Sequence, residues 1–188
     1  LTLNSSGAAT LTEAAAVDSK SDNCAAPAIT FSQSAFNCAS VALSPITVTV
    51  TATDASSNTA TDDIVITVED TEDPATPTPS AVTVDCDGVL TAPTTTDNCA
   101  GTITGTTTGT LSFVEGGSTT ITWTFDDGNG NSVTATQVYN YDDVTDPAIP
   151  TLSAVTVDCD GVLTAPTTTD ACAGTITGTT TGTLSFVE

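Results

Sequence analysis

The six cysteines are the residues with the clearest potential chemistry, and they occur as three local pairs. No CxxC motif and no histidine accompanies them. Zinc needs four clustered thiolates or imidazoles, and a catalytic thiol needs a neighbouring base. We therefore expect structural disulfides between sequence neighbours, formed in an oxidising compartment outside the cytoplasm and contributing about 3 kcal/mol each. The expected pairs are Cys24 with Cys38, Cys86 with Cys99, and Cys159 with Cys172.

Carboxylates are the second group with potential chemistry, because 23 residues are Asp or Glu. Several crowd into two proline-containing segments, VEDTEDPATPTP and YDDVTDPAIPTL. Calcium takes six to eight oxygen ligands from flexible arrays of such side chains, so these segments are candidate calcium sites that converge with a neighbouring loop. The alternative is a solvated charged surface that maintains solubility. The candidate calcium ligands are Glu69, Asp70, Asp73, Asp142, Asp143 and Asp146.

Catalysis has few possible participants in this chain. Arg and His are absent, and Lys20 is the single cationic side chain. Carboxylate pairs of the kind that glycosidases use are conceivable around Cys86 or at Asp126 and Asp127. However, adjacent strand residues point to opposite faces of a sheet, and these pairs belong to a repeated pattern. We therefore expect that the protein is not an enzyme.

The formal charge of −22 excludes two classes of partner. Nucleic-acid binding depends on Lys and Arg that neutralise phosphates, and anionic membrane surfaces attract the same residues. No apolar run reaches the length of a membrane span. We expect neither nucleic-acid nor membrane partners, and a folded chain because 38% of residues are hydrophobic.

An internal repeat organises the chain. The sequence from 80 to 115 returns from 153 to 188, and the only change is Ala171 in place of Asn98, so the offset is 153 − 80 = 73 residues. The same offset relates Asp54 to Asp127 and Asn58 to Asn131. We predict three repeats at 1–72, 73–145 and 146–188, joined by stiff proline-containing linkers.

Strict alternation of apolar and polar residues predicts the strands that hold these repeats together. Ile121, Trp123 and Phe125 share one face, and in the first repeat the alternate residues Ile46, Val48, Val50 and Ala52 do the same. The turn-forming segments TDASSNT and DDGNGNS predict hairpins whose second strands span 59–68 and 132–141. The earlier expected strands are 1–3, 9–12, 29–32, 82–85, 89–91 and 102–105.

About seven short strands in each repeat predict an all-β fold of tandem immunoglobulin-like β-sandwiches that form an extended rod. In this fold Trp123 belongs to the core, because it alternates in phase with Ile121 and Phe125. The competing role for Trp123, Tyr139 and Tyr141 is an aromatic platform for sugars. The third repeat reaches Glu188 without a counterpart of ITWTFDD. We therefore expect either a longer polypeptide or completion by a strand from a neighbouring subunit.

Two groups of motifs carry a resemblance that spans essentially the whole chain. The first repeat, with LTLNSSGAATLTE, ITFSQSAFNC, ITVTVTATDASSNTAT and VEDTEDP, resembles the hyalin-repeat-like modules of giant surface adhesins of the Bacteroidetes. The later repeats, with VTVDCDGVLTAPTTTDNCAGTITG and ITWTFDDGNGNSVTATQ, are similar to the companion immunoglobulin-like repeats. The resemblance implies export to the cell surface, display in a long filament, and a role in attachment or gliding.

These observations predict a structural or adhesive segment of a secreted cell-surface filament. The expected partners are neighbouring repeats or further copies of the chain, with surface polysaccharide as a possible ligand. The alternative is a set of carbohydrate-binding or spacer modules attached to a larger secreted enzyme. An exposed aromatic pair would favour this alternative, whereas covered aromatics and near-identical repeats would favour the filament.

Overall fold

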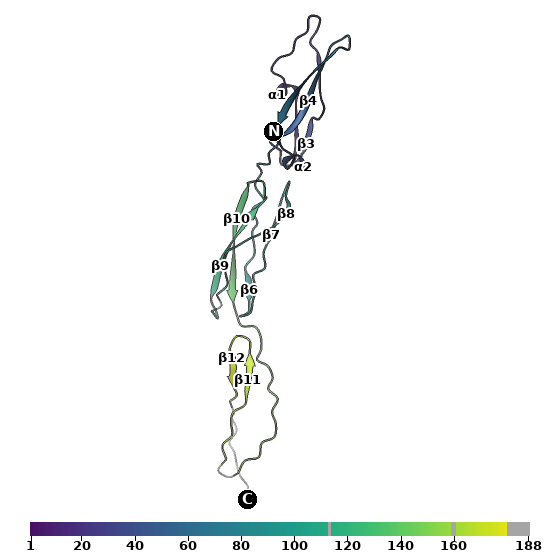
Figure 1. Ribbon diagram of the computed structural model, residues 1–188. Helices are drawn as coiled ribbons and strands as arrows, with labels where there is room; N and C mark the ends of the chain where they lie inside the picture. The colour runs from purple at the N-terminus through teal and green to yellow at the C-terminus, as the bar shows by residue number, and fades with distance from the viewer. Residues whose placement is uncertain (113, 159–160, 180–188) are drawn as a thin grey trace. The chain divides into compact units, whose positions relative to one another are not determined.

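The computed structural model describes residues 1–112, 114–158 and 161–179 (Figure 1). The described residues form an all-β protein of several small sheets, with two helices of four residues each. The abundance of Thr and Val explains this class, because β-branched side chains fit a pleated surface. The elements are β1 (Ala8–Thr10), α1 (Glu13–Ala16), β2 (Ala28–Phe31), β3 (Ala35–Asn37), α2 (Cys38–Val41), β4 (Ile46–Thr53), β5 (Thr59–Ile66), β6 (Val82–Val84), β7 (Thr94–Asp97), β8 (Gly101–Thr104), β9 (Ser118–Asp126), β10 (Ser132–Tyr141), β11 (Thr167–Asp170) and β12 (Gly174–Thr177).

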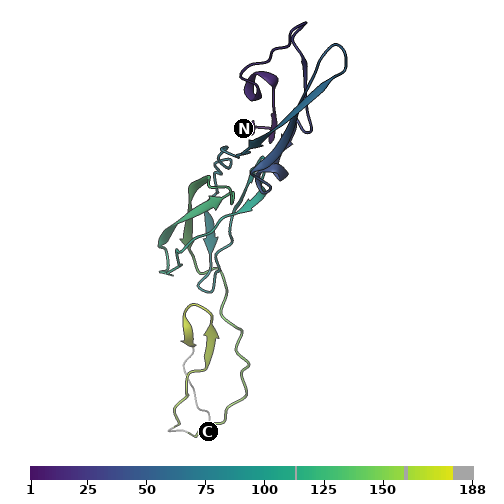
Figure 2. The same ribbon diagram turned by 45° about the horizontal axis from the view of Figure 1, so that its top comes forward.

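Two long hairpins form the largest parts of the sheets (Figures 1 and 2). Strands β4 and β5 pair antiparallel along their full length, and β2 pairs with the other edge of β4. Strands β9 and β10 are neighbours in a second sheet, in which β6 pairs parallel with the end of β10. The turns of the two hairpins have a residue at positive φ in the same repeat position, Ser57 at 69° and Gly130 at 110°.

Three two-stranded sheets complete the described structure. Strand β1 pairs with β3, β7 pairs with β8, and β11 pairs with β12, all antiparallel. The last two hairpins have the same register: Thr94 lies opposite Thr104, and Thr167 lies opposite Thr177. These four-residue strands come from the two near-identical parts of the sequence.

The buried side chains follow the alternation in the strands. In β9, Ile121, Trp123 and Phe125 are buried while the residues between them are more exposed. The prediction that Trp123 belongs to the core is confirmed. Tyr139 and Tyr141 of β10 are also buried. A separate core cluster contains Leu3, Leu11, Phe36, Val48 and Val68.

Contacts divide the chain into two compact units. One contains Leu1–Thr78, Ala92–Thr107 and Thr122–Ala135, and the other contains Pro79–Thr91, Thr108–Ile121 and the residues from Thr136 onward. The second sequence repeat contributes to both units. The boundaries of the three repeats therefore remain a prediction from the sequence.

Most of the expected strands are present, with shifts of one or two residues at their ends. The 132–141 strand is confirmed with the same bounds, and 59–68 ends at Ile66. The expected strand at 89–91 is wrong, since these residues lie in an irregular segment. The 1–3 strand is reduced to an isolated bridge between Thr2 and Glu69. The sequence patterns missed β3, β7 and both short helices.

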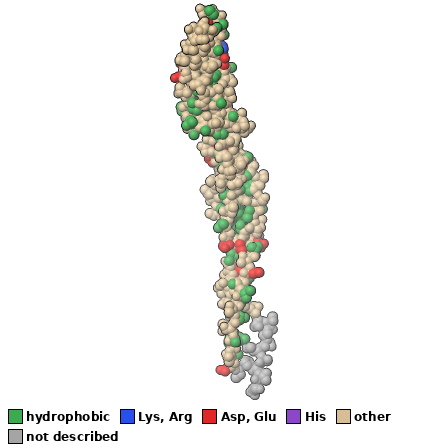
Figure 3. Space-filling model, turned by 90° about the vertical axis from the view of Figure 1, so that its right-hand side faces the viewer, with side chains coloured by type: hydrophobic (Ala, Val, Ile, Leu, Met, Phe, Trp, Pro, Cys, Tyr) green, Lys and Arg blue, Asp and Glu red, His purple; other side chains and the backbone are tan. Residues whose placement is uncertain are grey.

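Charge is distributed unevenly between the two signs. On the face shown in Figure 3, red acidic side chains occur at several places, whereas blue marks a single spot. The single lysine, Lys20, forms an ion pair with Glu13, with 2.5 Å between Nζ and Oε1. Among the described residues, no helix has both the length and the apolar character that a membrane crossing requires.

Candidate functional site: disulfide-bonded and acidic repeat junctions

The first disulfide joins a cysteine of the first predicted repeat to a cysteine of the second, and both lie in one compact unit. Cys38, the first residue of α2, bonds to Cys99 in the turn between β7 and β8, with 5.1 Å between the Cα atoms. Gly7 lies against this bond at a φ of 70°, and a Cβ at this position would lie 2.6 Å from Cys38 Sγ. The Asn98 side chain adds a second link, because its Nδ2 donates to the Asn4 carbonyl at 3.1 Å.

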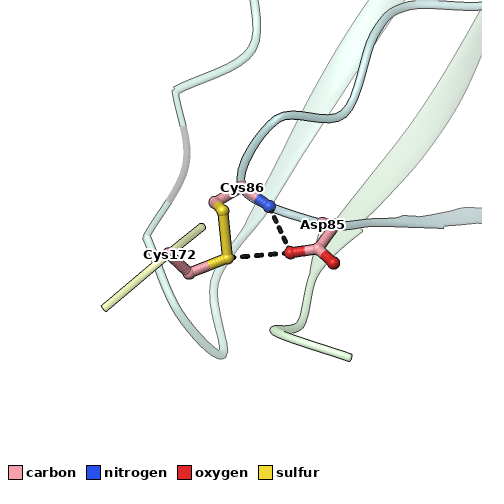
Figure 4. Close-up of side chains that lie close together, drawn as sticks. All are labelled: Asp85, Cys86 and Cys172. Atoms are coloured by element: carbon pink, nitrogen blue, oxygen red, sulfur yellow. Dashed lines mark hydrogen bonds between the residues drawn. A yellow bond between two sulfur atoms is a disulfide. The ribbon is translucent and has the colours of Figure 1, made fainter. Parts of the chain in front are cut away.

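The second disulfide joins the second repeat to the third (Figure 4). Cys86 follows β6 and bonds to Cys172 in the turn between β11 and β12, with 5.4 Å between the Cα atoms. Asp85 Oδ1 accepts a hydrogen bond from the Cys86 amide at 2.7 Å and lies 2.8 Å from Cys172 Sγ. Ala171 stands at the position of Asn98, so the side-chain bond of the first junction has no counterpart here.

The expected disulfide pairs within single repeats are therefore wrong. Cys38 and Cys99 do not pair with Cys24 and Cys86, and Cys24 is exposed and has no disulfide partner among the described residues. Cys172 bonds to Cys86, so its expected pair with Cys159 is also wrong. Cys159 itself lies outside the described residues.

The physical reason is that strands separate cysteines that are close in the sequence. Between Cys24 and Cys38 the chain runs through β2 and β3, which belong to different sheets. Cys86 follows β6, which pairs with the end of the ten-residue β10. Asp97, two residues before Cys99, is grouped with Asp127 near the start of that strand. A strand of this length spans about 33 Å, whereas disulfide Cα atoms lie within about 7 Å of each other.

An acidic cluster lies beside the first disulfide. Asp70, Asp97 and Asp127 each place a carboxylate oxygen within 4.8 Å of the others. Asp70 is only 5% exposed. Asn129 Nδ2 donates to Asp70 Oδ2, and Asn131 Nδ2 donates to its backbone carbonyl, both at 3.2 Å. Asp70 follows β5, Asp97 ends β7, and Asp127 opens the turn between β9 and β10, so three segments that are distant in sequence build this cluster.

Hydrogen bonding keeps Asp127 charged in this cluster. Burial raises the pKa of its carboxyl group, but donation from the Asn131 side chain and from backbone amides of the turn outweighs burial and lowers the pKa below its usual value. The Asn131 Nδ2 bond to Asp127 Oδ2 is 2.7 Å long. In contrast, Asp97 Oδ2 is buried and has no hydrogen-bond partner among residues 1–112, 114–158 and 161–179. A cation bound by oxygen would satisfy this atom.

The second junction repeats part of this cluster. Asp143 and Asp170 stand 73 positions after Asp70 and Asp97, and they group with Cys172 within 4.8 Å. Within the described residues, Asp170 Oδ2 is buried without a hydrogen-bond partner, as Asp97 Oδ2 is. The neighbouring Asp85 accepts a hydrogen bond from Thr145 Oγ1 at 2.5 Å, and this bond, followed by the one from Cys86 N–H, lowers the pKa of Asp85.

Of the six expected calcium ligands, the described clusters contain Asp70 and Asp143. Glu69, Asp73, Asp142 and Asp146 are exposed. The sequence reasoning missed Asp97, Asp127 and Asp170. The signal that could have found them was the 73-residue offset, which places an aspartate in TTTDNC and TTTDAC and another in the hairpin turn.

In comparison with known proteins, no protein-family model and no curated protein matches the chain.

Proposed function

We propose that this chain is a structural and adhesive segment of a secreted cell-surface filament, built from tandem immunoglobulin-like β-sandwich repeats of the hyalin-repeat-like kind. The observation that carries the proposal is the pair of disulfides, each of which joins one sequence repeat to the next. A filament must transmit tension between domains without separating them. Covalent bonds across successive junctions meet this requirement, and they favour an oxidising, extracellular location.

The disulfides also have a large effect on stability for their number. They close loops of 61 and 86 residues. In the chain-entropy model, loops of this size contribute about 4 to 5 kcal/mol each, more than the short loops expected from the sequence. The two loops overlap, because Cys86 precedes Cys99. Tension applied at the ends therefore bypasses most of the chain between Cys38 and Cys172.

Stretching single molecules of the 188-residue chain tests this load path. With both disulfides intact, the extensible path consists of residues 1–38, 86–99 and 172–188, or about 240 Å at roughly 3.5 Å per residue. Reduction with a thiol should release the full chain, about 660 Å by the same measure. Disulfides within single repeats would give about 530 Å before reduction. This intermediate value would overturn the proposal that covalent bonds carry load across the junctions.

Location is tested separately by immunogold labelling of intact cells of the source organism, with an antibody against the purified chain. Label along surface fibres supports the filament. Label confined to the cell interior contradicts it.

The alternative, a carbohydrate-binding module of an enzyme, has less support. The aromatic residues that could stack on a sugar, Trp123, Tyr139 and Tyr141, are all at most 3% exposed. A hollow of about 460 Å³ beside α1 and the β2–β4–β5 sheet is lined by aliphatic residues such as Ile29, Val50 and Ile64 and by small polar and charged residues. None of the described residues that line it is aromatic. Stacking platforms depend on exposed aromatic faces.

Calcium forms the second part of the proposal. We propose that Asp70, Asp97 and Asp127 bind Ca²⁺ at the first junction, with Asp143 and Asp170 in the equivalent place at the second. Three carboxylates lie close together there in a chain with one Lys and no Arg, and the buried Asp97 Oδ2 has no hydrogen-bond partner in the described part of the chain. A divalent cation would offset this repulsion and stiffen the junction.

Calcium titration of the chelator-treated chain, followed by calorimetry and by the melting temperature, tests this site. Asp97→Asn should weaken calcium binding by about tenfold or more, since it removes a charged ligand. Asp73→Asn is the matched control, because Asp73 is exposed and outside the cluster. Equal losses in both variants, or no calcium effect at constant ionic strength, would show that the carboxylates are a solvated surface.

A further inference from the structure

The two disulfides use one kind of loop on their C-terminal side. Cys99 lies in Thr96-Asp97-Asn98-Cys99-Ala100, and Cys172 lies in the matching segment Thr169 to Ala173. In both loops the aspartate Oδ1 accepts hydrogen bonds from the cysteine amide and from the next amide, all at 2.8 Å. Each of these cysteines bonds to a cysteine of the preceding repeat. The junction is therefore directional. The cysteine of the earlier repeat, Cys38 or Cys86, is called the trailing cysteine, and the loop of the later repeat that contains Cys99 or Cys172 is called the leading loop.

The first repeat contains a leading loop of the same kind, at Ser21-Asp22-Asn23-Cys24-Ala25. The Cys24 amide donates to Asp22 Oδ2 at 3.2 Å. As Cys99 precedes β8, Cys24 precedes β2 by a few residues. The difference is that Cys24 is exposed and forms no disulfide within the part of the chain that the structure describes. The same motif is thus oxidised in the second and third repeats, whereas among the described residues it is unpaired in the first.

A neighbouring turn extends this correspondence beyond the cysteine. Asn58 Nδ2 donates to Asp54 Oδ2 at 2.7 Å, and Asn131 Nδ2 donates to Asp127 Oδ2 at the same distance. The Asn58 amide donates to Asp54 Oδ1 at 2.8 Å, as the Asn131 amide does to Asp127 Oδ1 at 3.0 Å. Ala28, the first residue of β2, pairs with Thr53, the last residue of β4. The segment before β2 therefore lies at the same end of the sheet as the turn at Asp54 to Asn58.

At the first junction, the matching turn receives the end of the preceding repeat. Asn131 Nδ2 binds the Asp70 carbonyl while Cys99 bonds to Cys38. Asn58 and Cys24 are the counterparts of Asn131 and Cys99 here, while Ser56 stands at the position of Asn129. Within the described residues, no segment from another repeat occupies them.

We propose that the Ser21–Ala25 loop and the Asp54–Asn58 turn form a docking half-site for the trailing end of another repeat of this kind, and that Cys24 forms a disulfide with its trailing cysteine. This inference rests on the proposed filament, because it names the partner at one of its junctions. Asn58 Nδ2 binds the carbonyl that follows the last strand of that repeat, in the role of Asn131.

The bond forms by thiol–disulfide exchange with glutathione disulfide or the disulfide of an oxidoreductase. The Cys24 thiolate attacks one sulfur of that oxidant, which forms a mixed disulfide and releases one thiolate. The thiolate of the trailing cysteine then attacks Cys24 Sγ in the mixed disulfide and displaces the second thiolate of the oxidant. Two thiols of the repeats are oxidised and the oxidant is reduced to two thiols, which take up the two protons that the repeat thiols lose.

Two variants of the full chain test the pairing. The donor carries Cys24→Ser, Cys159→Ser and Cys172→Ser, which leave Cys86 without its partner. The acceptor carries Cys159→Ser and keeps Cys24. After mixing in reduced and oxidised glutathione, mass spectrometry of peptides should find a Cys24–Cys86 bond between the two chains. A second donor with Cys24→Ser, Cys99→Ser and Cys159→Ser, which frees Cys38, should give a Cys24–Cys38 bond, so the test does not depend on the folding of one variant.

The matched control places an equally exposed thiol outside the half-site, in an acceptor with Cys24→Ser and Ser34→Cys. Docking should raise the effective concentration of the thiols, so the Cys24 acceptor should yield at least about tenfold more mixed dimer. Asn58→Ala in the acceptor should lower this yield while the free thiol remains.

Equal yields from Cys24 and the control thiol would overturn the inference, as would Cys24–Cys24 dimers in place of the mixed product. Such a result leaves the proposed function intact if the bonds Cys38–Cys99 and Cys86–Cys172 are still found. Loss of those two bonds from the peptide map would instead remove the basis of the filament proposal.

Discussion

The second and third repeats contain almost the same sequence in different surroundings. Residues 94–104 and 167–177 form the same hairpin with the same register. In contrast, Val82–Val84 is strand β6, while the identical residues Val155–Val157 form no strand in the described structure. Val82 is partly buried, whereas Val155 is 69% exposed. The hairpin follows from local sequence, but β6 requires the distant strand β10 as a partner.

Burial differs between the repeats for the same reason. Ile103 is 8% exposed, whereas its counterpart Ile176 is only partly buried. At Gly105, an added Cβ would lie 2.9 Å from the ring of Phe125. At Gly178, the nearest contacts are atoms of Pro166 instead. The local sequence therefore forms the hairpin in both repeats. Its apolar face becomes buried only where a strand such as β9 packs against it.

The largest expected effect is on the hydrogen exchange of the β7–β8 and β11–β12 hairpins when their disulfides are removed. Cys172→Ser should expose the amides of β11 and β12 to hydrogen exchange at rates close to those of an unfolded chain, because an isolated two-stranded hairpin is marginal in water. Cys99→Ser should leave β7 and β8 protected, since Thr106 still pairs with Thr124. Exchange followed by mass spectrometry measures both variants. Equal protection of the two hairpins after these changes would contradict the comparison.

The next effect is expected in the strand that covers the second repeat. Phe125→Ala removes a side chain with no exposed surface and should lower the free energy of unfolding by about 3 to 5 kcal/mol. It should also make residues 82–84 exchange as 155–157 do. Denaturant unfolding gives the free energy, and Ser34→Ala on the exposed surface serves as a control. A loss below about 1 kcal/mol would show that β9 does not support this repeat.

A smaller effect compares one position in both repeats. Val84→Ala should cost about 1.5 kcal/mol, since it removes two methyl groups from a residue that is 8% exposed. Val157→Ala, in the identical sequence, should change stability by less than about 0.5 kcal/mol. Thermal unfolding of the two variants under the same conditions measures the difference. Similar losses would mean that both valines are buried alike in solution.

Alternation made the long strands predictable from sequence. The strand 132–141 and the buried face of Ile121, Trp123 and Phe125 follow from a period of two, which is a local property. Strand β3 was missed because Ala35–Asn37 has only Phe36 as a buried apolar residue. Residues 89–91 were wrongly expected as a strand, because their apolar pair Val89 and Leu90 has no strand beside it among the described residues.

The junctions were less predictable because they depend on long-range contacts. The repeat offset related Asp70 to Asp143, but it could not show that Asp97 and Asp127 lie beside Asp70. Cysteine spacing favoured bonds between sequence neighbours, whereas the observed bonds span 61 and 86 residues. The pairing of the cysteines depends on where the ends of the strands lie in space. Local sequence patterns do not contain this information.

The smallest expected effect compares the equivalent turns of the first and second repeats as the pH falls. Hydrogen bonds from Asn58 lower the pKa of Asp54, and hydrogen bonds that outweigh burial lower the pKa of Asp127. A carboxyl group whose pKa is lower in the folded state stabilises the fold above its unfolded value of about 3.9, and this stabilisation is lost as the pH falls through the folded pKa. Asp127→Asn and Asp54→Asn should therefore each flatten the decline of melting temperature below pH 4. The effect should be larger for Asp127, which is 9% exposed, than for the more exposed Asp54. Measurements in chelator exclude a contribution from bound calcium. A steeper decline in either variant would show that protonation of the carboxyl group relieves repulsion, and would reverse the assigned sign.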